Sequence, residues 1–172
     1  TAMVFDLDPG EPATLLDCAG VAIELRQMLR DVQLESYAKT SGGKGLHLYV
    51  PLNTDVTFEH TKAFSQAMAL LAEQAMPRRV VARMAKHLRA GKVYVDWAQN
   101  ERFKSTVCVY SLRARSRPTV STPVTWEEVQ SAWESRDASR LVFETADVLR
   151  RVRERGDVWK NVLHLGQDLP AV

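Results

Sequence analysis

Apolar residues recur with helical period in two long stretches of the chain. In residues 14–32 and 57–76 the spacing of the apolar residues places them on one face of a helix and the polar side chains on the opposite face. Pro77 follows the second stretch and ends it, because proline cannot continue the helical hydrogen bonding. Both stretches are therefore predicted to be amphipathic helices.

Two shorter helices are predicted toward the C-terminus. Thr125 precedes one of them, and Glu128 stands at the capping-box position three residues later. Residues 145–155 form the other, and Gly156 is expected to end it.

Short apolar runs between the helices predict β-strands. Residues 34–40 and 46–51 are joined by Ser41-Gly42-Gly43-Lys44-Gly45, so we expect a hairpin. Other strands are predicted at residues 3–8, 93–97 and 106–112. Residues 113–125 are rich in Ser, Thr, Pro and Arg and resemble an exposed connection.

Length and composition are those of one soluble domain. The chain has 172 residues, of which 45% are hydrophobic. Cys18 and Cys108 lie in apolar surroundings without metal-ligand spacing, so we expect small core residues of a reducing compartment and no structural zinc. The sequence has no signal-like leader and no apolar run of membrane-spanning length, which predicts a cytoplasmic protein with no membrane partner.

Positive charge is concentrated in one part of the chain. Between positions 78 and 117 only Asp96 and Glu101 are acidic, whereas the basic residues are Arg78, Arg79, Arg83, Lys86, Arg89, Lys92, Arg102, Lys104, Arg113, Arg115 and Arg117. A solvated face is the usual explanation of such charge, and a phosphate-binding surface is the functional alternative.

Two carboxylates lie in the first predicted strand. Asp6 and Asp8 are spaced i, i+2, so their side chains share a face and stand roughly 7 Å apart. Two like charges at such a site favour a cation between them. The alternative is that Asp8 merely caps the turn at Pro9-Gly10.

The glycine-rich turn at residues 41–45 is a candidate anion site. Its glycines allow backbone N–H groups to approach an anion, Ser41 adds a hydroxyl, and Lys44 adds a charge. It lacks the Walker A pattern, and a plain glycine hairpin is the alternative. His47 points to the face opposite Leu46 and Leu48, where a structural histidine is also common.

A third carboxylate, Asp96, lies in the apolar strand at residues 93–97. Burying it alone would be costly, so it is a candidate third ligand beside Asp6 and Asp8, with Mg²⁺ or Mn²⁺ as the suited ions. Arg89, Gln99 and Arg113 flank it in sequence. Three carboxylates, an anion site and arginines are what two-metal nucleotidyl transfer requires.

Taken together, these motifs resemble the polymerase domain of bacterial DNA ligase D, a branch of the archaeo-eukaryotic primase superfamily. The resemblance covers residues 3–133 and rests on Phe5-Asp6-Leu7-Asp8-Pro9-Gly10, Lys39-Thr40-Ser41-Gly42-Gly43-Lys44-Gly45-Leu46-His47, Leu88-Arg89-Ala90-Gly91-Lys92-Val93-Tyr94-Val95-Asp96-Trp97, Gln99-Asn100 and Tyr110-Ser111-Leu112-Arg113. It implies catalytic and metal-binding roles for Asp6, Asp8 and Asp96 with two Mn²⁺ or Mg²⁺ ions. It implies nucleotide-binding roles for Ser41, Lys44, His47, Arg89, Gln99 and Arg113.

The resemblance also implies a fold and partners. The fold is α+β, with a mixed, mostly antiparallel sheet of the RNA-recognition type, helices on one face and the carboxylates on the other. The partners are DNA ends with a 5'-phosphate and a 3'-hydroxyl, nucleoside triphosphates with ribonucleotides favoured, Ku and a DNA ligase domain. Family domains carry further sequence upstream of the Asp-x-Asp strand, so residues 1–172 are expected to be the C-terminal catalytic part of such a domain.

Three alternatives stay open at this point. A stand-alone repair primase-polymerase would carry the same motifs. A haloacid-dehalogenase-type phosphatase also begins with Val-Phe-Asp-Leu-Asp, although it usually continues with Gly-Thr, where this chain has Pro9-Gly10. A non-catalytic module would use the basic segment alone to hold DNA.

Overall fold

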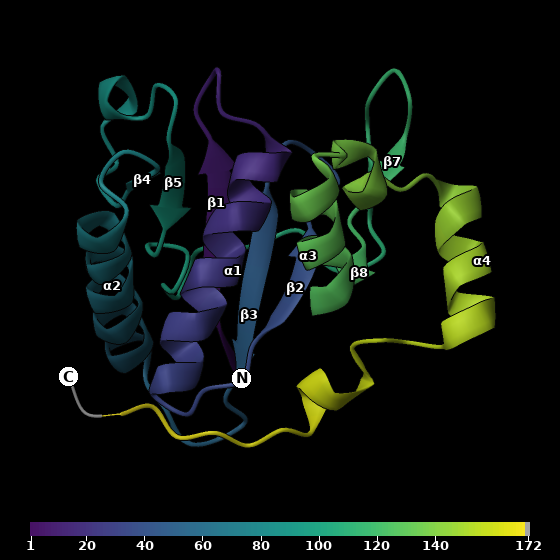
Figure 1. Ribbon diagram of the computed structural model, residues 1–172. Coiled ribbons are helices and arrows are strands. Elements are labelled where there is room, and N and C mark those ends of the chain that lie inside the picture. The colour runs from purple at the N-terminus through teal and green to yellow at the C-terminus, as the bar shows by residue number, and fades with distance from the viewer. Residues whose placement is uncertain (171–172) are drawn as a thin grey trace.

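One mixed β-sheet organises the chain, with helices packed on one of its faces (Figure 1). The computed structural model describes residues 1–170. Six strands pair in the order β4-β5-β1-β3-β2-β8, and only the pair β4 and β5 is parallel. The strands of this sheet are β1 (Ala2–Pro9), β2 (Tyr37–Thr40), β3 (Leu46–Pro51), β4 (Val80–Val81), β5 (Val93–Asp96) and β8 (Pro123–Val124). The expected α+β class with a mostly antiparallel sheet is confirmed.

The helices are α1 (Leu15–Asp31), α2 (Phe58–Ala75), α3 (Trp126–Ser135) and α4 (Thr145–Arg155). Three short 3-10 helices, η1 (Lys86–Leu88), η2 (Ala138–Leu141) and η3 (Lys160–Leu163), lie in the connections. All four predicted helices are present. Thr125 and Glu128 form the expected capping box, and Gly156 ends α4 with φ of 71°.

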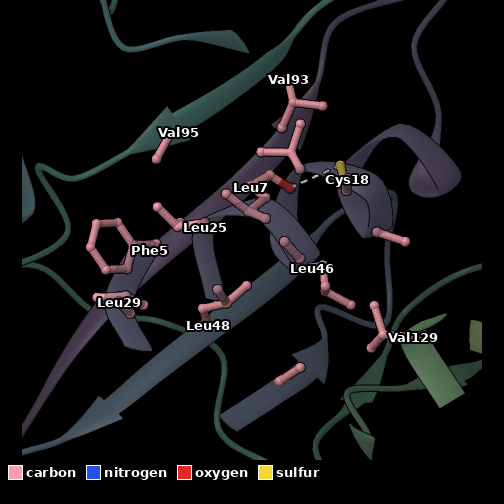
Figure 2. Packing of buried hydrophobic residues seen from close by; sticks show 14 of the residues in the cluster. Phe5, Leu7, Cys18, Leu25, Leu29, Leu46, Leu48, Val93, Val95 and Val129 are labelled. Carbon is pink, nitrogen blue, oxygen red and sulfur yellow. Dashed lines mark hydrogen bonds between the residues drawn. The ribbon is translucent and has the colours of Figure 1, made fainter. Parts of the chain in front are cut away.

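The core fills the space between the helices and the sheet. Along β1 every second residue is fully buried toward the helices, and Phe5 and Leu7 meet Leu48 of β3 and Leu25 of α1 there (Figure 2). Full burial of one such side chain contributes about 1.5–3 kcal/mol. Cys18 lies in the same layer, where its thiol donates to the Leu7 carbonyl oxygen at 3.4 Å.

The segment between β5 and α3 differs from its prediction. Only β6 (Leu112–Arg113) forms where a strand over residues 106–112 was expected, and it pairs with β7 (Thr119–Val120) in a separate two-stranded sheet. The prediction fails because Tyr110 adopts φ of 63°, which a strand cannot contain.

Two further expectations were wrong in the same region. Residues 113–125 are not simply an exposed connection, since Ser121 and Thr122 are buried and β8 forms an edge of the main sheet. Cys108 is exposed rather than a core residue, because its segment leaves the sheet, whereas Cys18 is buried as expected.

The C-terminal segment returns across the sheet end at which β1 begins (Figure 1). Trp159 is buried with its ring 5.0 Å from Tyr49 and its indole N–H donating to the Ala38 carbonyl at 3.1 Å. Further along, the Gln167 side chain donates to the carbonyls of Pro51 and Glu35. None of the helices within residues 1–170 is long and apolar enough to cross a membrane.

Candidate active site

The strand register gathers the predicted acidic residues on the face of the sheet that the helices leave open. Asp6 lies directly opposite Asp96 of β5 on one side and His47 of β3 on the other. Asp8 lies two residues further along β1, opposite Tyr94. Because side chains alternate along a strand, all of these residues project away from the core. The predicted shared face of Asp6 and Asp8 is therefore confirmed.

Like charges crowd this part of the open face. Partial burial, together with the neighbouring carboxylates of Asp6 and Asp96, raises the pKa of Asp8, while His47 and Arg89 oppose the increase. A raised pKa means that the site disfavours the full set of negative charges unless a cation is present.

Four buried polar atoms at this site lack hydrogen-bond partners within residues 1–170, namely Asp6 Oδ1, His47 Nδ1, Arg89 Nε and Gln99 Oε1. His47 Nε2 lies 3.2 Å from Asp6 Oδ1, which is ion-pair distance without hydrogen-bond geometry. Asp6 Oδ1 and His47 Nδ1 are both left without a hydrogen bond. Such atoms are uncommon in folded proteins and fit a site that receives a ligand.

Asp96 is held in place by its own strand and by the loop that follows. Its Oδ1 accepts from the Tyr94 hydroxyl at 3.2 Å and from the Ala98 backbone N–H at 3.0 Å. Its Oδ2 accepts from Gln99 Nε2 at 3.3 Å. The structure thus brings Gln99 to the acidic residues, as the sequence predicts.

Arg89 approaches the same residues from the connection between β4 and β5. Its guanidinium lies 3.6 Å from the centre of the Tyr94 ring and donates to the Met84 carbonyl at 2.6 Å. Stacking and this hydrogen bond fix the charge beside Asp8. A Cβ on Gly10 would lie 2.0 Å from the Arg89 carbonyl oxygen, so the Pro-Gly turn is required for this close approach.

The glycine-rich turn lies next to the end of β1. A Cβ on Gly45 would lie 2.4 Å from the Leu7 carbonyl oxygen and 3.3 Å from Asp8 Oδ1. Ser41 Oγ accepts from the backbone N–H groups of Gly43 and Gly45, at 3.1 and 3.2 Å. The N–H groups expected to face an anion are therefore turned onto the Ser41 hydroxyl in this structure.

Charged side chains surround the turn. Lys44 is exposed and pairs with Glu11 at 3.0 Å. Arg113 packs against Gly42, and Arg115 lies beside Gly43. Ser41, Lys44 and Arg113 are thus brought together at one end of the hairpin.

The basic segment does not form a single surface. Arg79 lies over the Trp133 ring of α3, at 5.2 Å from its centre, on the face covered by helices. Arg83 pairs with Glu73 of α2. Only part of the positive charge counted in the sequence therefore faces the acidic site.

The sequence analysis did not single out Lys39, Tyr94 or Arg115 as site residues, although it counted Arg115 in the basic segment. Lys39 is directly opposite His47 in the hairpin and is fully buried. The predicted hairpin register could have placed it there, because the turn fixes which residues face one another. The position of Arg115 depends on the path of residues 106–122, which the sequence pattern predicted incorrectly.

A divalent cation fits the chemistry of Asp6, Asp8 and Asp96, whose hard oxygens converge from two adjacent strands. Within the described residues, however, no three His, Cys, Asp or Glu side chains are already arranged to hold one ion. The metal-ligand set therefore stays a prediction.

Comparison with known proteins gives a consistent match. The family model described as "LigD, primase-polymerase domain" matches residues 1–159. The chain is 45% identical over 158 residues to the multifunctional non-homologous end joining protein LigD of Mycolicibacterium smegmatis. The matched segment covers 92% of this chain and 20% of that protein. The chain is also 32% identical over 169 residues to the bifunctional non-homologous end joining protein LigD of Bacillus subtilis. That match covers 98% of this chain and 27% of the relative.

A solved structure indicates the same family as the family model and the two relatives. The polymerase domain of Mycobacterium tuberculosis ligase D in complex with DNA superimposes with a TM-score of 0.88 at 41% identity, covering 97% of this chain and 56% of the other. The chain thus spans about a fifth to a quarter of the length of these two curated relatives.

Proposed function

The chain belongs to the LigD primase-polymerase domain family, and on this basis we propose that it is a nucleotidyltransferase that adds nucleotides to DNA 3' ends and fills gaps during repair of double-strand breaks by end joining. The observation that carries the proposal is the position of Asp6, Asp8 and Asp96 on the face of the sheet opposite α1 and α2, beside a glycine-rich turn and arginines. Family membership disfavours the phosphatase alternative, whose resemblance is limited to the first strand.

Asp6, Asp8 and Asp96 would hold two Mn²⁺ or Mg²⁺ ions. Bound ions of this kind supply a polarised 3'-hydroxyl and neutralise the charge on a triphosphate. The raised pKa of Asp8, caused by partial burial and by the other two carboxylates, and the unpartnered Asp6 Oδ1 support this assignment. Tyr94 and Gln99 would orient Asp96 through the hydrogen bonds that they donate to it.

The incoming nucleotide would be held by the turn and by the residues around it. Ser41 and Lys44 would contact the triphosphate, and His47 would contact it from β3. Lys44 can exchange Glu11 for a phosphate at little cost, because both partners of that ion pair are exposed.

Arg89, Gln99 and Arg113 complete the proposed nucleotide site. Arg89 is fixed beside Asp8 by its stacking on Tyr94, so little ordering of this long side chain would be needed on binding. Arg113 lies at the other side of the turn, against Gly42. Arg89 and Arg113 would therefore both contribute positive charge to the binding of a polyanion.

The proposed partners are DNA ends with a 5'-phosphate and a 3'-hydroxyl, nucleoside triphosphates with ribonucleotides favoured, Ku and a DNA ligase domain. The relative solved with DNA supports the first of these. The relatives described as multifunctional end joining proteins support cooperation with other repair activities.

Primer extension on a gapped, 5'-phosphorylated duplex tests the proposal. Ribo- and deoxyribonucleotides are supplied with Mg²⁺ or Mn²⁺, and the wild-type chain is compared with Asp8→Ala. Asp55→Ala is the matched control, since Asp55 is exposed in the connection between β3 and α2. We expect loss of extension for Asp8→Ala only; equal extension by both variants would overturn the metal assignment.

A further inference from the structure

Lys39 is a fully buried lysine near the end of β2, two residues before the glycine-rich turn begins at Ser41. Its Nζ donates to Ser121 Oγ at 2.7 Å and lies 5.9 Å from the centre of the Tyr49 ring. Burial lowers the pKa of Lys39 to about 8, against the opposing effect of Asp6. Lysine is rarely buried without a carboxylate partner, because desolvation of the ammonium is costly.

Ser121 links this lysine to two other parts of the chain. Its hydroxyl donates to the Thr40 carbonyl at 2.9 Å, which leaves the oxygen free to accept from Lys39. Its backbone N–H donates to Ser111 at 2.9 Å, and its carbonyl accepts from Tyr110 at 2.7 Å. One buried residue thus joins β2 to the segment that precedes β6.

The same strip of chain touches the glycine-rich turn. Thr119 Oγ1 donates to the Gly42 carbonyl at 2.5 Å. A Cβ on Gly42 would lie 2.8 Å from the Ser121 backbone nitrogen and 2.7 Å from Arg113 Cγ. Arg113 in turn pairs with Thr119 between β6 and β7. The turn and Arg113 are therefore held against each other by the residues around Ser121.

We propose that Lys39 and Ser121 are positioning residues, a buried pair that aligns the 41–45 turn with Arg113 for the polyphosphate of a bound nucleoside triphosphate. The proposal rests on the proposed function, since it concerns the same site. Lys39 reaches the nucleotide only through Ser121, Thr40 and the turn. Its buried charge also adds positive potential behind the turn, where a polyanion would lie.

Lys39→Met separates this role from a purely structural one. Methionine has nearly the same length and carries no charge, so the cost of burying an ammonium disappears and the fold is expected to keep its stability or to gain some. The dissociation constant for ATP with Mn²⁺ should nevertheless rise about tenfold, because a charge-assisted hydrogen bond that fixes the turn is lost. In primer extension, KM for the nucleotide should rise while kcat changes little.

Ser121→Ala and the double variant complete a mutant cycle. If both residues act through one contact, the double variant should bind ATP no more weakly than the weaker single variant. Lys62→Met is the control, because Lys62 of α2 forms an exposed ion pair with Glu101. Additive losses in the cycle, or an unchanged ATP affinity in Lys39→Met, would overturn the proposal.

Amide hydrogen exchange distinguishes failure of this inference from failure of the proposed function. The Gly43 and Gly45 N–H groups, which donate to Ser41 Oγ, should exchange faster in Lys39→Met than in the wild-type chain. If the wild-type chain binds no ATP, the proposed function is wrong, and faster exchange then still supports the positioning of the turn. Unchanged exchange at these glycines overturns it in either case.

Discussion

Asn100 extends the sheet with a side chain where β5 has ended. Its Oδ1 accepts from the Val4 backbone N–H and its Nδ2 donates to the Val4 carbonyl, both at 2.8 Å. The Trp97 carbonyl oxygen at 2.9 Å and Ser65 Oγ at 3.1 Å share the second Nδ2 hydrogen. The amide thus pairs with β1 as a strand would, and it fixes the loop that follows Asp96.

Asn100→Ala should lower the free energy of unfolding by about 3 kcal/mol. Oδ1 accepts one hydrogen bond and the two Nδ2 hydrogens donate two at a time, so three hydrogen bonds are lost at about 1 kcal/mol each. In urea, with a slope of about 2 kcal/mol per molar, the midpoint should fall by about 1.5 M without a change of slope.

Asn100→Asp and an exposed control sharpen this test. An ionised carboxylate keeps the bond from the Val4 N–H but turns an acceptor toward the Val4 and Trp97 carbonyls, so this variant should be at least as unstable as Asn100→Ala at pH 7. Asn161→Ala, at an exposed position in η3, should change the midpoint little. A loss below 1 kcal/mol in Asn100→Ala would refute the reasoning.

Three other predictions concern charged groups. The pKa of Asp8 is raised by partial burial and by Asp6 and Asp96, so the free energy of unfolding falls as pH rises through that pKa. Asp8→Asn should therefore unfold at a higher temperature than the wild-type chain in EDTA at pH 7. Mn²⁺ should stabilise the wild-type chain more than the variant, and equal stabilisation would contradict a metal role. Burial lowers the pKa of Lys39 from 10.5 to about 8, so the unfolded chain binds more protons than the folded chain between these pH values. The free energy of unfolding, measured by denaturant titration, should rise with pH through this window by up to about 3 kcal/mol relative to Lys39→Met. Parallel pH profiles of the two proteins would exclude the pKa shift. Burial alone would raise the pKa of Glu128, but hydrogen bonds from Arg151 and from the Thr125 N–H hold this pKa below its ordinary value. Glu128→Gln should lower the free energy of unfolding by about 2 kcal/mol at pH 7, and acidification should destabilise this variant less than the wild-type chain. Identical acid transitions of the two proteins would contradict this.

Much of the site could be predicted because strands have a simple period. The i, i+2 spacing of Asp6 and Asp8 places both on one face whatever the rest of the fold does. The hairpin at residues 37–51 follows from the glycine-rich turn between two apolar runs. The pairing of β3 with β1, which then brings His47 beside Asp6, does not follow from the turn. Motif order then indicated the family, which the comparisons confirm.

The segment from residue 104 to 124 could not be predicted in the same way. Its conformation depends on contacts far away in sequence, such as that between Thr106 and Tyr49 and that between Tyr110 and Asp157. These contacts stabilise a positive φ at Tyr110 in a run that otherwise has strand composition. The hydrogen bond of Lys39 could not be predicted for a related reason, since its partner Ser121 lies in that segment.

The β2–β3 hairpin is anchored by two indole groups near its open end. Trp126 of α3 donates to the Ser36 carbonyl at 2.8 Å, and Trp159 donates to the Ala38 carbonyl at 3.1 Å. The turn at the other end is held by Thr119. A polyanion that binds at residues 41–45 therefore meets a backbone whose conformational entropy was already lost during folding, so that little further ordering opposes association.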